Sequence, residues 1–240
     1  MLCVSLSART MESCEAVLSG LASGEMVEIR ADLISSRGAG AVDDAGLASL
    51  CARPVPKVLT CRDLASAGFS DERRDLLVAL MRSMAEGAKS HDAKFESMID
   101  IEVEAPSEYR EALLAAAREN GVTVVISYHN YEETPSTEGL HEILADCRAK
   151  GADIAKVAVL CRNSRDAARV LALYDSESPV VALGMGAAGK VTRIAALDLG
   201  SPFTFVALSP ETATAPGQLT LQQMRDIRSS AAGPQTATTA

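Results

Sequence analysis

The chain has 240 residues, of which 48% are hydrophobic, and it is long enough to bury one large core. Its net charge of -9 argues against a broad basic surface, so neither nucleic acid nor an anionic membrane is an expected partner. The six cysteines form no CxxC pair and no Cys/His metal spacing, and no apolar run reaches the roughly 18 residues of a membrane span. No basic region followed by an apolar stretch opens the chain. We therefore expect a soluble cytoplasmic protein that binds a small molecule and no metal.

Eight short β-branched apolar runs, each typical of a β-strand, alternate with segments of helical spacing. The helical pattern is clearest from Asp71 to Lys89 and from Ser107 to Asn120, which Gly121 ends. Eight strand–helix units in this length predict a single (β/α)8 TIM barrel, with a doubly wound open sheet as the alternative. No glycine-rich phosphate loop follows the first strand, which favours the barrel. The predicted strands are Leu2–Leu6, Met26–Asp32, Lys57–Arg62, Met98–Val103, Thr123–Tyr128, Ile154–Leu160, Val180–Met185 and Phe203–Leu208.

The barrel accounts for residues 1–228, which we expect to form one catalytic domain. Residues 229–240 are rich in Ala, Thr, Gly and Pro and have no periodicity. We expect this stretch to be a disordered C-terminal tail.

Charged side chains recur at every second position inside several of these strands, although a buried parallel strand is normally apolar throughout. One face of each such strand would pack against helices, so the charged face points into the barrel. Burying one such charge unpaired costs on the order of several kcal/mol, whereas acids and bases that meet at one end of a barrel can pair with each other or with a ligand. An internal salt-bridge network without chemistry is the alternative, but groups from five strands converge, which favours an active site at the C-terminal mouth. The inward charged positions are Glu28, Arg30, Asp32, Asp100, Glu102 and Lys156, with Arg62 and His129 closing their strands.

Lys156 is the sharpest single signal, because it lies mid-strand between Ile154 and Ala158. Loss of solvation there disfavours the ammonium and favours the neutral amine that attacks ketones. His129 ends the neighbouring strand and is a candidate proton-transfer group. The other histidines, His91 and His141, fall in helical or loop contexts and receive no role.

Two later segments suggest substrate contacts. The glycine-rich stretch 184–189 precedes Arg193, whose guanidinium can fork onto a carboxylate. A loop from Glu211 to Gln218 contains Thr214 and could fold over the mouth as a lid.

Taken in order, these motifs resemble the type I 3-dehydroquinate dehydratases along nearly the whole chain. The matching stretches are Glu28-Ile29-Arg30-Ala31-Asp32, Thr60-Cys61-Arg62, Asp100-Ile101-Glu102, Ser127-Tyr128-His129, Ala155-Lys156, Met185-Gly186 with Thr192-Arg193, and Ala215-Pro216-Gly217-Gln218.

The resemblance implies a cofactor-independent dehydration of 3-dehydroquinate, a small anion, in a protein expected to be a homodimer. It makes Lys156 the Schiff-base nucleophile, His129 the general acid and base, and Glu102 the carboxylate that orients the histidine. It also implies that Arg193 and Gln218 bind the substrate carboxylate. The remaining substrate-binding positions that it implies are Glu28, Arg30 and Arg62 for the ring hydroxyls, together with Met185 and Thr214.

The chain departs from the family pattern in two places. Ser66-Ala67-Gly68 stands where the family usually has Glu-Gly-Gly, and Thr214 stands in place of a serine. Two other functions remain open at this point: a class I aldolase with a lysine on the same strand, and a catalytically silent ligand-binding barrel. Intact Lys156, His129 and Glu102 argue against the silent barrel.

Overall fold

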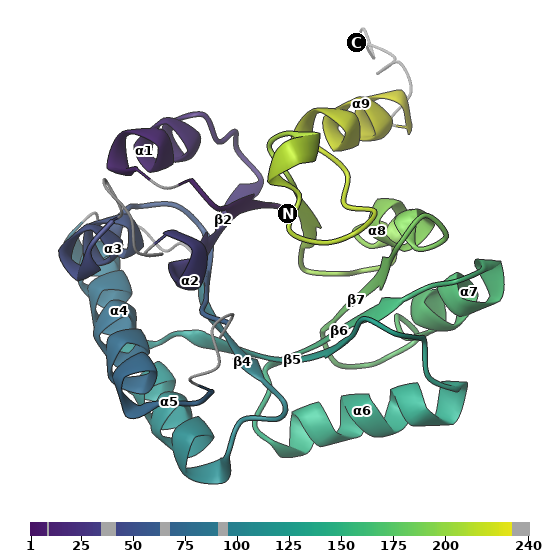
Figure 1. Cartoon of the computed structure of the whole chain (residues 1–240), viewed down its shortest axis with the longest axis horizontal. Helices are drawn as coiled ribbons and strands as arrows, with labels where there is room; N and C mark the ends of the chain where they lie inside the picture. Colours follow the sequence, from purple (N-terminus) through teal and green to yellow (C-terminus); the bar gives the residue numbers. More distant parts are fainter. Residues whose placement is uncertain (9, 35–41, 63–67, 91–95, 232–240) are drawn as a thin grey trace, which may run out of the picture.

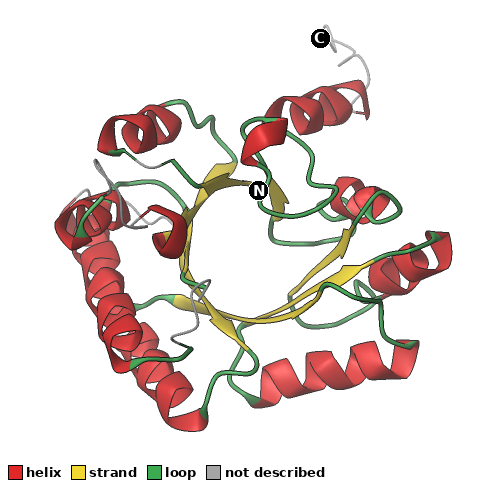
Figure 2. Cartoon of the chain, in the orientation of Figure 1, coloured by secondary structure: helices red, strands yellow, loops and turns green. Residues whose placement is uncertain are grey.

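The computed structural model describes residues 1–8, 10–34, 42–62, 68–90 and 96–231, in which eight parallel strands form one barrel. The strand order is β7-β6-β5-β4-β3-β2-β1-β8, so β1 pairs with β2 on one side and with β8 on the other. Figure 2 shows the strands as a ring with the helices outside it. The predicted (β/α)8 barrel is confirmed. The strands are β1 (Leu2–Leu6), β2 (Glu25–Arg30), β3 (Lys57–Thr60), β4 (Ser97–Glu102), β5 (Thr123–Asn130), β6 (Ile154–Leu160), β7 (Val180–Met185) and β8 (Thr204–Val206).

The helices follow the strands in turn, and both well-marked helical predictions are confirmed (Figure 1). Gly121 ends α5 in the left-handed conformation, with φ of 64°, and its N–H bonds the carbonyls of Ala117 and Arg118. Within the described residues, no helix is long and apolar enough to cross a membrane. The helices are α1 (Met11–Ser19), α2 (Ala31–Ile34), α3 (Asp44–Ala52), α4 (Asp71–Ser90), α5 (Ser107–Asn120), α6 (Thr137–Ala149), α7 (Ser164–Ala172), α8 (Lys190–Ala195), the 3-10 turn η1 (Pro210–Thr212) and α9 (Leu221–Ala231).

Several predicted boundaries were wrong by a few residues. The second strand ends at Arg30 because the chain turns into α2, so Asp32 leaves the strand and accepts hydrogen bonds from Arg30 at 3.0 and 2.6 Å. The third strand ends with the ladder pair of Arg30 and Thr60. Helix α9 continues to Ala231, into the predicted tail, and residues 232–240 lie outside the described part of the chain.

The barrel interior has an apolar lower layer and a polar upper layer. Phe203, Met26, Val58 and Val125 belong to a buried cluster inside the ring, and a larger cluster joins the outer face of the sheet to the helices. Gly87 of α4 permits the close approach of α3, because a Cβ there would lie 2.1 Å from the Ala52 carbonyl oxygen. The buried apolar cluster fills the lower part of the barrel, so the polar side chains of the interior lie at the carboxyl ends of the strands.

Candidate active site

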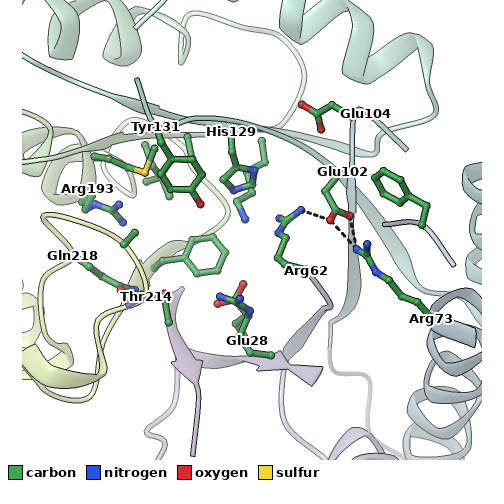
Figure 3. A pocket seen from close by; sticks show the side chains of 18 of the residues that line it. Glu28, Arg62, Arg73, Glu102, Glu104, His129, Tyr131, Arg193, Thr214 and Gln218 are labelled. Atoms are coloured by element: carbon green, nitrogen blue, oxygen red, sulfur yellow. Dashed lines mark hydrogen bonds and ion pairs between the residues drawn. The ribbon is translucent and has the colours of Figure 1, made fainter. Parts of the chain in front are cut away.

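A cavity of about 570 Å³ opens at the carboxyl ends of the strands, and every predicted site residue lines it. Figure 3 shows Arg193, Thr214 and Gln218 on one side, Arg62 and Glu102 on the other, and His129 between them. The two sides therefore differ in chemistry, and a ligand that spans the cavity meets both. The predicted residues in the wall are Glu28, Arg30, Arg62, Glu102, His129, Lys156, Met185, Arg193, Thr214 and Gln218.

Lys156 points inward from β6, as strand parity predicted, and only 5% of its side chain is exposed. Its Nζ lies 2.8 Å from Oδ2 of Asp100 and 4.4 Å from the ring centroid of Phe205. The buried position is confirmed. The sequence interpretation did not assign the amine its carboxylate partner, Asp100.

His129 lies on β5, the strand next to Lys156, and Tyr131 stacks beside it with ring centroids 6.3 Å apart. Burial, together with the positive charges of Arg62 and Lys156, holds the pKa of His129 well below its ordinary value. The imidazole is therefore neutral near pH 7 and able to accept a proton.

Asp100 of β4 is not part of the cavity wall. It bonds side chains from three neighbouring segments: Arg62 after β3, Ser127 of β5 and Lys156 of β6. Its Oδ1 accepts hydrogen bonds from Arg62 at 2.6 Å and from the Ser127 hydroxyl at 2.6 Å. Burial alone would raise the pKa of Asp100, but the charges of Arg62 and Lys156 outweigh it and hold the pKa well below its usual range. The carboxylate is therefore ionised. Strand parity predicted that Asp100 points into the barrel but gave it no role.

Glu102 binds a residue that the sequence interpretation missed. Both of its carboxylate oxygens accept hydrogen bonds from Arg73 of α4, at 2.7 and 2.9 Å, and Arg62 lies 3.5 Å away. Among the residues that the structure describes, no hydrogen bond joins Glu102 to His129. The role of Glu102 as the orienting carboxylate remains a prediction. Arg73 sits on a helix, where the alternation of a strand gives no signal.

The polar groups on β2 are held in place before any ligand arrives. Glu28 is buried and accepts a hydrogen bond from the Ser5 hydroxyl at 2.8 Å. Arg30 forks onto Asp32. Both therefore present fixed polar atoms toward the cavity.

Arg193 presents an unneutralised charge to the opposite side of the cavity. Its side chain is buried, and its Nε donates to the Gly184 carbonyl at 3.2 Å. No carboxylate of the described residues forms an ion pair with it. Burial lowers the pKa of Arg193 to about 10, the response of a cation that lacks a counter-ion. An anionic ligand group would supply one.

The predicted lid segment lies against the turn after β7. Pro216 accepts a hydrogen bond from the Gly186 N–H at 3.0 Å, and Gln218 accepts one from the Thr214 N–H at 2.8 Å. Gly217 has φ of +78°, and a Cβ there would lie 2.4 Å from the Gly186 carbonyl oxygen. Only glycine fits this contact without displacement.

Of the two departures from the family pattern, the structure describes Thr214 fully and the stretch Ser66-Ala67-Gly68 only at Gly68. Thr214 keeps a hydroxyl directed at Gln218 Oε1, 3.2 Å away. Ser66 and Ala67 lie outside the described residues, as does His91, whereas Gly68 reaches the cavity wall. Within the described ranges, no group of three or more His, Cys, Asp or Glu side chains is placed to hold a metal.

The fold and the cavity together define a (β/α)8-barrel enzyme with a small-molecule site at the carboxyl ends of its strands. The chain belongs to the type I 3-dehydroquinase family, whose sequence model matches residues 2–233.

Relatives agree with this assignment. The 3-dehydroquinate dehydratase of Methanothermobacter thermautotrophicus is 33% identical over 210 residues, which cover 86% of this chain and 85% of that protein. The enzyme of the same name from Methanosarcina barkeri is 29% identical over 207 residues, 85% of this chain and 84% of that protein. The solved 3-dehydroquinate dehydratase of Aquifex aeolicus superposes with a TM-score of 0.72 at 27% identity, covering 96% of this chain and 98% of that chain. The type I enzyme of Clostridium difficile, solved with covalently modified comenic acid, has a TM-score of 0.75 at 22% identity, covering 96% and 91%, and so supports the fold alone.

Proposed function

We propose that this 3-dehydroquinate dehydratase, a hydro-lyase of the shikimate pathway, acts through a Schiff base on Lys156 with His129 as its acid and base. The observation that carries the proposal is the buried amine of Lys156 in the cavity wall, one strand from a neutral histidine. Family membership favours dehydration over the aldol cleavage and over the silent barrel that the sequence left open.

The steps follow from the chemistry of an imine. The Lys156 ammonium gives up a proton, the free amine adds to the C3 ketone of 3-dehydroquinate, and the same proton returns to the carbinolamine hydroxyl, which leaves as water and gives an iminium. His129 removes a proton from C2, and the electrons of that bond move onto the iminium nitrogen to give an enamine. The enamine expels the C1 hydroxyl, which takes a proton from His129 and leaves as water. Hydrolysis of the remaining iminium releases 3-dehydroshikimate and frees Lys156.

Substrate orientation uses the two sides of the cavity. We assign the substrate carboxylate to Arg193 and Gln218, because the buried guanidinium lacks a counter-ion. The ring hydroxyls then lie on the other side of the cavity, toward Glu28, Arg30 and Arg62. Hydrogen bonds to neighbouring side chains hold these three residues in place. Met185 and Thr214 complete the contact at the lid.

Glu102 enters the proposal as a positioning residue. Its ion pairs with Arg73 and Arg62 place its carboxylate in the cavity wall. Glu102 and His129 line the same cavity, which supports the orienting role of Glu102 toward the histidine.

Borohydride trapping tests the mechanism. Reduction in the presence of 3-dehydroquinate should leave a secondary amine on Lys156, seen by mass spectrometry of the digested protein, and Lys156→Ala should abolish it. Lys150→Met is the matched control, because Lys150 pairs with Asp146 and does not line the cavity. An unmodified Lys156 in a fully active sample would rule the Schiff base out.

Three further assignments are also proposals. A cytoplasmic location is supported by six buried free cysteines, since reduced thiols are typical of that compartment. One catalytic domain over residues 1–228 is supported by the single ring of strands. A homodimer is supported by the resemblance alone, and light scattering of the purified protein tests it.

A further inference from the structure

The nitrogen of Lys156 is enclosed differently on its two sides. The cavity wall includes Lys156 and Phe205 but not Asp100. Asp100 has no exposed side-chain surface, and its Oδ2 reaches the amine from inside the barrel, 2.8 Å away. A ligand therefore approaches the nitrogen from the cavity, while Asp100 contacts the same nitrogen from behind.

Asp100 is also the one carboxylate among the described residues that forms an ion pair with Lys156. Glu28 is engaged by the Ser5 hydroxyl, and Glu102 is engaged by Arg73. Four other titratable or charged groups interact electrostatically with Lys156 or Asp100: Cys3 of β1, Arg62 after β3, His129 of β5 and Cys147 of α6.

We propose that Asp100 is the counter-ion of the reacting nitrogen, pairing with the Lys156 ammonium in the resting enzyme and with the iminium in the covalent intermediate. This inference rests on the Schiff-base mechanism proposed above. The ammonium and a ketone give the iminium and one water with no net change in protons: three N–H hydrogens become one N–H and two hydrogens of water. The nitrogen therefore carries one positive charge at both ends of the step, and a single fixed carboxylate can neutralise both states.

The surroundings of Asp100 suit a fixed charge better than a proton acceptor. Arg62 and the Ser127 hydroxyl both donate to Oδ1, which leaves Oδ2 directed at Lys156. Hydrogen bonds to the charged form keep the carboxylate ionised. The proton movements at C2 and at the leaving hydroxyl therefore fall to His129 rather than to Asp100.

The proposal predicts a specific effect of Asp100→Asn, which removes the charge and keeps the shape. Loss of one charge-assisted contact should lower the yield of borohydride-trapped adduct at neutral pH by on the order of tenfold to a hundredfold. In the enzyme without substrate, Lys156 should react with a small amine-directed reagent at lower pH than in the wild type, because an uncharged amide stabilises the ammonium less than a carboxylate does.

Ser127→Ala is the matched control, since it removes a hydrogen bond to the same carboxylate and leaves the charge in place. It should keep the wild-type pH dependence of Lys156 modification. A merely structural role for Asp100 would alter both variants alike, and that result would overturn the proposal, as would an Asp100→Asn enzyme with wild-type trapping and pH dependence.

Asp100→Glu extends the test if Asp100→Asn does not fold. The longer side chain retains the charge, so the wild-type pH dependence of Lys156 modification should persist, and its loss would contradict the counter-ion role. Failure of the wild type to trap any adduct refutes the Schiff base itself. Equal trapping by the wild type and Asp100→Asn refutes only the counter-ion.

Discussion

Replacement of Arg193 by Met should weaken substrate binding and at the same time stabilise the unliganded protein. Burial lowers the pKa of Arg193 to about 10 from an ordinary 12.5, which corresponds to a cost of roughly 3 kcal/mol for the charged side chain. Met keeps most of the buried stem and removes that charge. It also removes the charge-assisted hydrogen bond to the Gly184 carbonyl, worth about 2 kcal/mol. The net gain of about 1 kcal/mol should raise the melting temperature by roughly 2 to 4 °C for a chain of this size.

Binding should change in the opposite direction. Loss of a charge-assisted contact to the substrate carboxylate, worth about 1.5 to 3 kcal/mol, should raise KM by roughly tenfold to a hundredfold. Steady-state rates, followed by the ultraviolet absorbance of the conjugated product, and thermal melting without ligand measure the two effects.

Arg225→Met is the matched control for Arg193→Met. Arg225 donates to both oxygens of the buried Glu25 at 2.7 Å, at the amino end of β2 and away from the cavity. Its loss strands a buried carboxylate, so the melting temperature should fall while KM stays constant. A normal KM for Arg193→Met, or a melting temperature that falls as in the control, would mean that Arg193 is a structural residue.

Four further outcomes are expected. His129→Ala should slow elimination by about 10² to 10⁴-fold and still give trapped adduct, whereas Lys156→Ala should give none; wild-type turnover in His129→Ala contradicts the assignment. Gly217→Ala should raise KM by displacing the segment Glu211–Gln218 from Gly186, while Gly200→Ala, with φ of +94° and no atom within 4 Å, should bring backbone strain alone and leave KM unchanged. The pKa of His129 in the folded protein lies well below 6.5, so on acidification the unfolded chain binds a proton at His129 before the folded protein does. The free energy of unfolding should therefore fall as the pH drops below about 6.5. Calorimetry of His129→Ala should show a smaller loss of stability between about pH 7.5 and 5.5 than the wild type shows. Activity should survive exhaustive chelation, since the iminium supplies the electron sink; a loss restored by a divalent ion would identify the acidic residues as ligands.

The sequence alone predicted the barrel and ten of the residues that line its cavity. Alternation along a strand is a local property, so the inward parity of Glu28, Glu102 and Lys156 could be read without any knowledge of the neighbouring strands. The same logic located the closing residues Arg62 and His129. Arg73 escaped prediction because it comes from α4, where no strand parity applies, and it reaches Glu102 only through the packing of that helix.

Which carboxylate meets Lys156 was decided by tertiary structure. Asp100 and Glu102 are two residues apart on the same face of β4, so parity treats them alike. In the ladder, Glu102 pairs with Ser127 and Ser127 pairs with Lys156, which would suggest Glu102 as the partner. The amine instead bonds Asp100. Strands tilt against the axis of a closed barrel, so residues in ladder register lie at different heights, and a long side chain meets the residue at its own level. This tilt arises only when the strands are arranged in a barrel, and it places the charge of Asp100 against the nitrogen of Lys156.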